Sequence, residues 1–186
     1  MADKLIVGLG NPGKKYEKNR HNVGMMLLDS MTERWQEKFK GLYAQENIAG
    51  SKVYYLKPQT FMNLSGESVQ PLAQFFKIQV ADILVVHDEL DLPYGTLALK
   101  RGGGLAGHNG LKSIAAQLGT QDFLRLRLGI GRPPHGDVSN WVLSDFSKEE
   151  NIVFNKFLTE GASALKTFLE KGFDAAASSY SRKSVL

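Results

Sequence analysis

Apolar positions along the chain recur with two spacings, and these predict strands that alternate with helices. The continuous apolar run 83–86 is typical of a strand buried on both faces of a parallel sheet. Apolar residues three and four positions apart predict amphipathic helices. The strands expected on this basis are 4–9, one or two within 48–56, 83–86, 96–101 and 123–130. The expected helices are 22–39, one that opens at Ser65, 109–118, and a long last one that opens at Ser147.

The order of these elements predicts the fold class. Asn22 is a good N-cap for the helix 22–39. Ser147 and Glu150 have the spacing of a capping box at the start of the last helix. Strands that alternate with helices are typical of an α/β fold. We therefore expect a single domain over 1–186, a three-layer sandwich with a mixed, mostly parallel central sheet flanked by helices.

Composition narrows the classes of protein. The chain has 186 residues, of which 42% are hydrophobic and 23% charged, as in a globular protein. The absence of cysteine excludes a disulfide scaffold, a thiolate zinc site and a cysteine nucleophile, and it favours a reducing compartment. No apolar run has the length of a signal peptide's core or of a membrane span. We expect a soluble, cytoplasmic protein.

The net charge of +4 is concentrated in one segment. Residues 98–136 contain six bases and one acid, a net charge of +5, whereas the rest of the chain has seventeen bases and eighteen acids. The six bases are Lys100, Arg101, Lys112, Arg125, Arg127 and Arg132. A basic segment on a near-neutral chain favours a polyanionic partner. Chance clustering on a solvated surface is the alternative.

Arg125 and Arg127 alternate with leucines in the strand 123–130. This alternation predicts a half-buried strand with both arginines on its polar side.

The first glycine-rich segment, Gly8 to Gly13, has the GxGxxG spacing of a dinucleotide-binding loop. Such a loop runs directly into a helix whose N–H groups face the pyrophosphate. Here Pro12 removes one donor, and 14–20 has no apolar face for a helix to bury. We therefore favour a turn that places Asn11 in a cleft, with a nucleotide-dependent oxidoreductase as the weaker hypothesis.

A histidine and a carboxylate form the candidate catalytic pair. His21 precedes a predicted helix, and Asp88 follows the buried strand 83–86. Functional groups gather at the carboxyl ends of strands in open α/β sheets. A carboxylate that accepts from one imidazole nitrogen leaves the other free to deprotonate water. The alternative for a loop histidine such as His21 is a surface position without a function.

Two further segments have features of a binding site. Phe61, Met62 and Asn63 place an apolar wall and an amide before a helix, although Phe61 or Met62 is also plausible as a hydrophobic staple. Residues 102–110 hold five glycines in nine positions and end at His108 and Asn109. Lysine and arginine beside such a loop and a helix N-terminus favour phosphate. The alternative is a flexible surface linker.

The histidine spacings and the absence of a GxSxG motif argue against a zinc site and a serine triad. Hydrolysis by an activated water is the simplest remaining chemistry. The residues alone thus predict a hydrolase with a His–Asp base, amides that bind substrate carbonyls, and a basic site for a polyanion.

The chain resembles bacterial-type peptidyl-tRNA hydrolases in six segments that follow the family's order and spacing. They are VGLGNPG at 7–13, RHN at 20–22, TFMNLSG at 60–66, HDELDLP at 87–93, GHNG at 107–110 and RLRLGIG at 125–131. The resemblance implies a single-domain α/β hydrolase that cleaves the ester between a peptide and the 3′-terminal ribose of tRNA, in translation and ribosome rescue. It implies a monomer that binds the acceptor stem and 3′ end, without a metal or organic cofactor.

The resemblance also implies roles for individual residues. His21 is expected to be the base, Asp88 its orienting carboxylate, and Asn11 part of the catalytic group. Asn11, Asn63 and Asn109 are expected to hold the peptide backbone and the attacking water. The expected substrate contacts are Tyr16, Phe61 and Met62 in the peptide channel, and Asn22 and His108 where the acceptor end enters. Lys100 and Arg127 match a clamp for the 5′ phosphate of tRNA.

The sequence departs from the family pattern at Ala98, where a second clamp lysine is common, and we expect Arg101 to replace that lysine. Leu105-Ala106 stands where His-Gly is often found. A catalytically silent RNA-binding module, like the splicing-factor relatives of this fold, is the alternative function. The combination of His21, Asp88, Asn11 and Asn63 favours the enzyme, because binding alone does not require these residues together.

Overall fold

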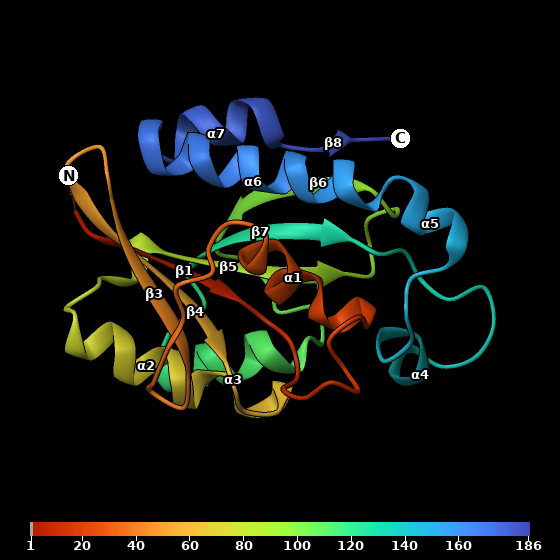
Figure 1. Ribbon diagram of the computed structural model, residues 1–186, viewed down its shortest axis with the longest axis horizontal. Coiled ribbons are helices and arrows are strands. Elements are labelled where there is room, and N and C mark those ends of the chain that lie inside the picture. The colour runs from red at the N-terminus through yellow and green to blue at the C-terminus, as the bar shows by residue number, and fades with distance from the viewer. Residues whose placement is uncertain (1) are drawn as a thin grey trace.

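A computed structural model, which describes residues 2–186, shows three layers (Figure 1). An eight-stranded mixed sheet forms the middle layer, and helices cover both of its faces. The predicted fold class is therefore confirmed. No helix among residues 2–186 has the length and apolar character needed to cross a membrane.

The sheet has the strand order β2-β3-β4-β1-β5-β7-β6-β8. The three inner pairings, β4–β1, β1–β5 and β5–β7, are parallel, and the outer pairings are antiparallel. The strands are β1 (Lys4–Gly8), β2 (Gln36–Lys38), β3 (Gly41–Ile48), β4 (Ser51–Pro58), β5 (Ile83–Glu89), β6 (Thr96–Arg101), β7 (Leu124–Gly129) and β8 (Lys183–Ser184). The parallel centre brings the carboxyl ends of β1 and β5 to the same edge, where ligand sites of such sheets lie.

The helices pack in two sets. The α-helices are α1 (Val23–Asp29), α2 (Gly66–Phe75), α3 (Asn109–Leu118), α4 (Val138–Val142), α5 (Lys148–Ile152), α6 (Phe154–Lys171) and α7 (Phe173–Tyr180), and the 3₁₀ turns are η1 (Arg20–Asn22), η2 (Met62–Leu64) and η3 (Val80–Asp82). Helices α1, α6 and α7 bury one apolar core against the sheet. Helices α2 and α3 bury a second core against its other face.

Two glycines let α1 pack directly on the strands. A Cβ on Gly8 would lie 2.6 Å from the carbonyl oxygen of Gly24, and one on Gly24 would lie 2.4 Å from the carbonyl oxygen of Val86. No side chain fits at such distances, so the glycines permit this close approach. The segment 14–18 forms turns and no helix follows Gly13 directly, as the argument against a dinucleotide loop predicts. This packing places η1 at the carboxyl ends of β1 and β5.

The predicted helix 22–39 is wrong beyond its first two turns. Helix α1 ends at Asp29, and the chain then enters the hairpin β2–β3. Met31 and Trp35 still pack against the core, but from non-helical backbone. Phe39 and Lys40 form the hairpin loop with φ values of 59° and 52°. Pairing with β3, together with packing of the Phe39 ring on Phe76, outweighs the local helical pattern.

The structure settles one further prediction and corrects another. The segment 48–56, expected to hold one or two strands, contains parts of two: the end of β3, a turn at Ala49–Gly50 and most of β4. The capping box at Ser147 is present, but the expected long helix is divided into α5, α6 and α7. One of the breaks falls at Gly172, whose φ of 90° is not helical. Helices α6 and α7 still pack against the same face of the sheet.

Candidate active site

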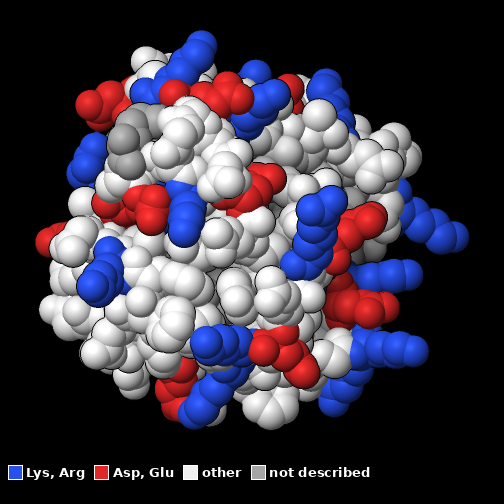
Figure 2. Space-filling view, turned by 60° about the vertical axis from the view of Figure 1, so that its left-hand side comes forward, with Lys and Arg blue, Asp and Glu red and all other residues white. Residues whose placement is uncertain are grey.

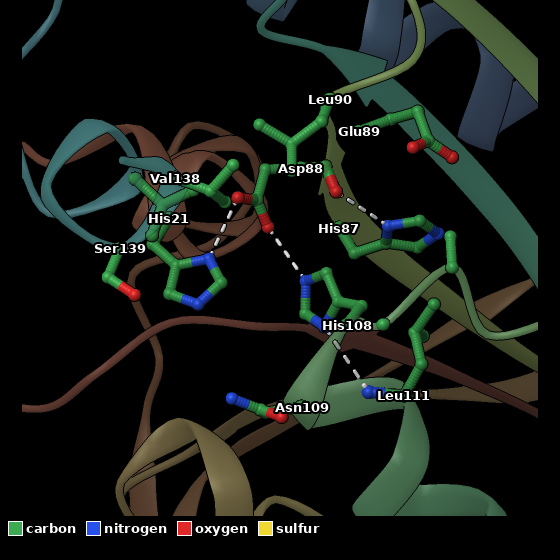
Figure 3. A pocket seen from close by; sticks show the side chains of 13 residues that line it. His21, His87, Asp88, Glu89, Leu90, His108, Asn109, Leu111, Val138 and Ser139 are labelled. Carbon is green, nitrogen blue, oxygen red and sulfur yellow. Dashed lines mark hydrogen bonds and ion pairs between the residues drawn. The ribbon is translucent and has the colours of Figure 1, made fainter. Parts of the chain in front are cut away.

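The carboxyl end of β5, the turn η1, helix α4 and the N-terminus of α3 meet at one cavity of about 180 Å³. His21 enters it from η1, Asp88 from β5, and His108 and Asn109 from the start of α3 (Figure 3). The structure thus brings four of the predicted residues together. Because they come from three elements of a packed sheet-and-helix framework, their positions are fixed by the fold.

Asp88 bridges two histidines. Its Oδ2 accepts a hydrogen bond from Nδ1 of His21, and its Oδ1 accepts one from Nε2 of His108, both at 2.8 Å (Figure 3). The Asp88 side chain is only 2% exposed. Burial opposes ionisation of this carboxyl, but the two imidazoles outweigh burial and hold its pKa well below its ordinary value. Asp88 is therefore a buried carboxylate with both oxygens engaged.

The tautomer of His108 follows from its backbone contacts. Its Nδ1 accepts hydrogen bonds from the N–H groups of Gly110 and Leu111, at 3.1 and 3.3 Å, and so caps α3. A nitrogen that accepts from two N–H groups carries no proton, so Nε2 carries it and donates to Asp88. Both ring nitrogens of His108 are therefore occupied.

His21, unlike His108, forms a hydrogen bond through only one of its ring nitrogens. Nδ1–H donates to Asp88, so the neutral ring carries a lone pair on Nε2. In Figure 3 this nitrogen points away from Asp88, toward the side on which the Asn109 amide lies, and both residues line the cavity. Burial lowers the pKa of His21, but the charge and hydrogen bond of Asp88 outweigh burial and raise it above 6.5. His21 is thus the stronger candidate for a general base.

His87 lies beside His21 and His108 but has no bond to the Asp88 carboxylate. Its side chain is buried, Nδ1 donates to the carbonyl oxygen of Asp88 at 2.9 Å, and its ring meets that of His108 edge to face. Burial, and then the neighbouring His108, lower the pKa of His87 to about 3. His87 is therefore neutral at physiological pH and supports the His108 ring by packing.

The same three groups also have the spacing of a metal site, because the ligand atoms of His21, Asp88 and His108 lie within 4.8 Å of one another. The hydrogen bonds argue against that use. Nε2 of His108 carries a proton, so it has no lone pair to give a metal. The cluster fits proton chemistry better than coordination.

Asn11 and Asn22 form a second structural unit next to His21. The amide oxygen of Asn22 accepts from the Asn11 N–H, and its amide nitrogen donates to the Asn11 carbonyl, both at 2.8 Å. The Asn11 side-chain oxygen accepts from the N–H of Met62 at 2.7 Å. Asn22 occupies the N-cap position of α1, as predicted, but its side chain makes no capping hydrogen bond. It is buried and holds the Asn11 backbone in place.

The remaining predicted substrate contacts do not line the His21 cavity. Asn11 and Asn22 line a neighbouring hollow of about 260 Å³. Tyr16 and Phe61 meet edge to face, with ring centroids 6.5 Å apart, and Phe61 is 57% exposed. Met62 is buried, whereas Asn63 is exposed on η2. The pair of His21 and Asp88 thus lies next to a second hollow, which Asn11 lines.

Helix α4 contributes residues that sequence reasoning missed. Val138, Ser139 and Val142 line the His21 cavity, and Figure 3 shows Val138 and Ser139 beside His21. No element was predicted between 131 and 146. A signal was present, because the Asp137 carboxylate caps α4 by accepting from the N–H of Asn140 at 2.7 Å. The helix is too short for a convincing periodicity.

The basic segment does not form one surface. In the β6–β7 pairing Ala98 lies opposite Arg127 and Lys100 lies opposite Arg125, so all four side chains share one face of the sheet. Arg101 points to the other face, with its guanidinium 4.6 Å from the Phe173 ring. Arg101 therefore does not replace the missing clamp lysine. The structure brings Lys100 and Arg127 together and separates Arg101 from them.

Arg125 corrects the prediction for strand 123–130. It is 2% exposed, and its guanidinium donates to the carbonyl oxygens of Gly103, Gly104 and Gln121. It therefore anchors the glycine-rich loop and is not part of a polar surface.

The face of the molecule on the left side of Figure 1 is mixed in charge. Figure 2, which turns this side forward, shows Lys and Arg interspersed with Asp and Glu.

Comparisons of family, sequence and structure with known proteins all lead to the same family. The family model "Peptidyl-tRNA hydrolase" matches residues 5–185. A peptidyl-tRNA hydrolase of Desulfitobacterium hafniense is 50% identical over 96% of this chain and 100% of that protein, and one from Geobacter sp. is 47% identical over 98% and 100%. A crystal structure of peptidyl-tRNA hydrolase from Acinetobacter baumannii superimposes with a TM-score of 0.88, at 36% identity over 96% of this chain and 94% of that one. None of these findings favours the silent RNA-binding module.

Proposed function

The chain belongs to the peptidyl-tRNA hydrolase family, whose enzymes hydrolyse the ester bond between a peptide and tRNA, and on this premise we propose that His21 is the general base of the reaction. One observation carries the assignment. Of the four histidines, His21 pairs with a buried carboxylate through one ring nitrogen and keeps the other toward an open cavity. His108 uses both nitrogens, and the buried His87 donates to a backbone carbonyl and not to a carboxylate.

In the proposed mechanism Nε2 of His21 removes a proton from water as the water oxygen attacks the ester carbonyl carbon. The ester carbonyl becomes an oxyanion, and an amide N–H such as that of Asn109 is placed to stabilise it. The intermediate collapses by breaking the bond to the ribose oxygen, which takes the proton from the imidazolium. Asp88 stabilises the imidazolium and keeps the ring in the required tautomer.

The two hollows suggest how the substrate lies. Residues 21 and 22 are neighbours, yet His21 lines the first cavity and Asn22 the second. We place the ribose and the tRNA 3′ end in the first cavity, beside His108 and α4. The peptide then runs through the second space, where Asn11 presents its amide. Tyr16, Phe61, Met62 and Asn63 are proposed contacts farther along the peptide.

Lys100 and Arg127 are the proposed contacts with the 5′ phosphate of the acceptor stem. They lie on the same face of adjacent strands, and Arg127 has only a loose ion pair with Glu89, at 3.9 Å. A cation without a close partner is available to a phosphate. We further propose that residues 1–186 form one domain, which acts as a monomer in the cytoplasm to recycle tRNA during ribosome rescue.

The pH dependence of kcat/KM tests the base directly. His21 must be neutral to accept a proton, and Asp88 raises its pKa above 6.5. We expect kcat/KM for N-acetyl-aminoacyl-tRNA to rise with pH and to level off above a pKa higher than 6.5. NMR titration of the His21 ring in the free enzyme should give the same value. A rate that does not depend on pH between 5 and 8 would exclude His21 as the base.

Lys100→Ala should weaken tRNA binding without affecting the chemistry. We expect KM for N-acetyl-aminoacyl-tRNA to rise several-fold and the slope of log(kcat/KM) against log[salt] to flatten by about 0.7–0.9, because one phosphate contact is lost. A minimal ester, N-acetyl-aminoacyl-adenosine, should react at the parent rate. Arg101→Ala is the control, since it removes the same charge from the opposite face. Equal effects of both variants would show that net charge acts, and not a phosphate contact at Lys100.

A further inference from the structure

Arg20, the residue before the proposed base, is buried, and both terminal nitrogens of its guanidinium have hydrogen-bond partners far away in the chain. It is 4% exposed. One terminal nitrogen donates to the Ser144 hydroxyl at 2.6 Å and to the Asp145 carbonyl oxygen at 2.8 Å, and the other donates to the Glu150 carboxylate at 2.7 Å. All three acceptors lie more than 120 residues away in the sequence. The side chain therefore ties η1 to the segment 144–150.

The ring of Trp141 stacks on the same guanidinium. Its central carbon lies 3.5 Å from the centroid of the Trp141 ring, within contact distance for stacking. Trp141 belongs to α4, and its indole N–H donates to the Gly131 carbonyl at 2.8 Å. Since Val138, Ser139 and Val142 of this helix line the catalytic cavity, Arg20 reaches the cavity wall through Trp141.

The backbone beside Arg20 is fastened to the same segment. The Arg20 N–H donates to the Ser144 carbonyl at 3.0 Å, and the Asn19 amide donates to the Asp145 carboxylate at 2.8 Å. Only one residue farther on, His21 turns the other way and donates to Asp88. The position of the His21 backbone is thus set on one side by segment 144–150 and on the other by β5.

We infer that Arg20 is a positioning residue of the hydrolase, which holds α4 against the cleft and fixes the turn from which His21 reaches Asp88. The inference rests on the proposed role of His21. Arg20 does not line the cavity, so it acts through its neighbours and not on the substrate. The planar fork of a guanidinium serves three acceptors and a ring face at once, whereas a lysine ammonium cannot match that geometry.

Arg20→Lys tests this role, because it keeps the charge and removes the fork. With N-acetyl-aminoacyl-tRNA we expect kcat to fall at least tenfold, while KM changes less than threefold. The acid limb of the kcat profile should move to lower pH, because His21 is held less firmly against Asp88. Hydrogen exchange of the full chain should accelerate in 138–145 and stay unchanged in α2 and α3.

Arg101→Lys is the matched control, since it makes the same replacement where a guanidinium lies over the Phe173 ring and 3.5 Å from Asp174. It should leave kcat and the pH profile unchanged. Ser144→Ala gives a second reading if Arg20→Lys does not fold, because it removes one acceptor and should lower kcat two- to fivefold. The proposal is overturned if the folded Arg20→Lys variant, or Ser144→Ala in its place, keeps the parent kcat and pH profile. A failure of the base assignment would show separately, as activity retained when His21 itself is replaced.

Discussion

Replacement of His21 by asparagine is expected to lower kcat about 10²- to 10⁴-fold, the contribution of a general base. Asparagine can still donate an N–H toward Asp88, so the buried carboxylate keeps a partner there. It has no basic nitrogen, so the water must be deprotonated by solvent. Single-turnover hydrolysis of N-acetyl-aminoacyl-tRNA at saturating enzyme measures the chemical step without interference from binding.

The stability of the same variant should depend on pH in a definite direction. Because the pKa of His21 is raised in the folded protein, its charge stabilises the fold below pH 6.5, and this contribution is lost as the pH rises through the folded pKa. The free energy of unfolding of His21→Asn should therefore lie below that of the parent at pH 5, and the difference should shrink by pH 8. His135→Asn, at an exposed position, is the control and should change neither quantity. A His21→Asn variant within threefold of the parent rate would rule out this base.

The parts of the fold that the sequence predicted well are those where local and tertiary preferences agree. Strand β6 and helix α3 begin and end at the predicted residues. Gly119, with a φ of 75°, ends α3 as a glycine C-cap does. The proposed pair of His21 and Asp88 is also found in contact, because the carboxyl end of a buried central strand is where such a sheet presents polar groups.

The failures have a common physical cause, which is contact between residues far apart in the chain. The apolar spacing through 22–39 is satisfied by packing of Met31 and Trp35, yet pairing of β2 with β3 decides their backbone. Arg125 alternates with leucines as a surface residue does, but the carbonyls of the glycine-rich loop meet its guanidinium inside the protein. Neither partner can be identified from a local pattern.

The role of His108 shows the same limit at the active site. The family resemblance suggested a contact with the entering acceptor end, and His108 does line the cavity. Its bond to Asp88 and its cap on α3 depend on three elements meeting at one point. Asp88 thus holds His108 as well as the proposed base, His21.

That shared carboxylate makes Asp88→Asn the second substitution with a large expected effect. An amide presents one oxygen and one N–H-bearing nitrogen, so it can accept from either His21 or His108, while its nitrogen faces the N–H of the other. One histidine therefore loses its partner. We expect kcat to fall at least about 10²-fold, because the imidazolium loses its charge stabilisation and the tautomer of His21 is no longer fixed.

The pH profile separates this explanation from a loss of folding. Burial lowers the pKa of His21, and in the parent the charge of Asp88 outweighs that effect. Without the charge, the pKa should fall below 6.5 and the acid limb of kcat/KM should move to lower pH. Asp91→Asn is the matched control, because Asp91 is an exposed carboxylate three residues away that pairs with Arg132. If Asp88→Asn keeps an acid limb above pH 6.5, the raised pKa of His21 has another source and Asp88 is not its partner in catalysis.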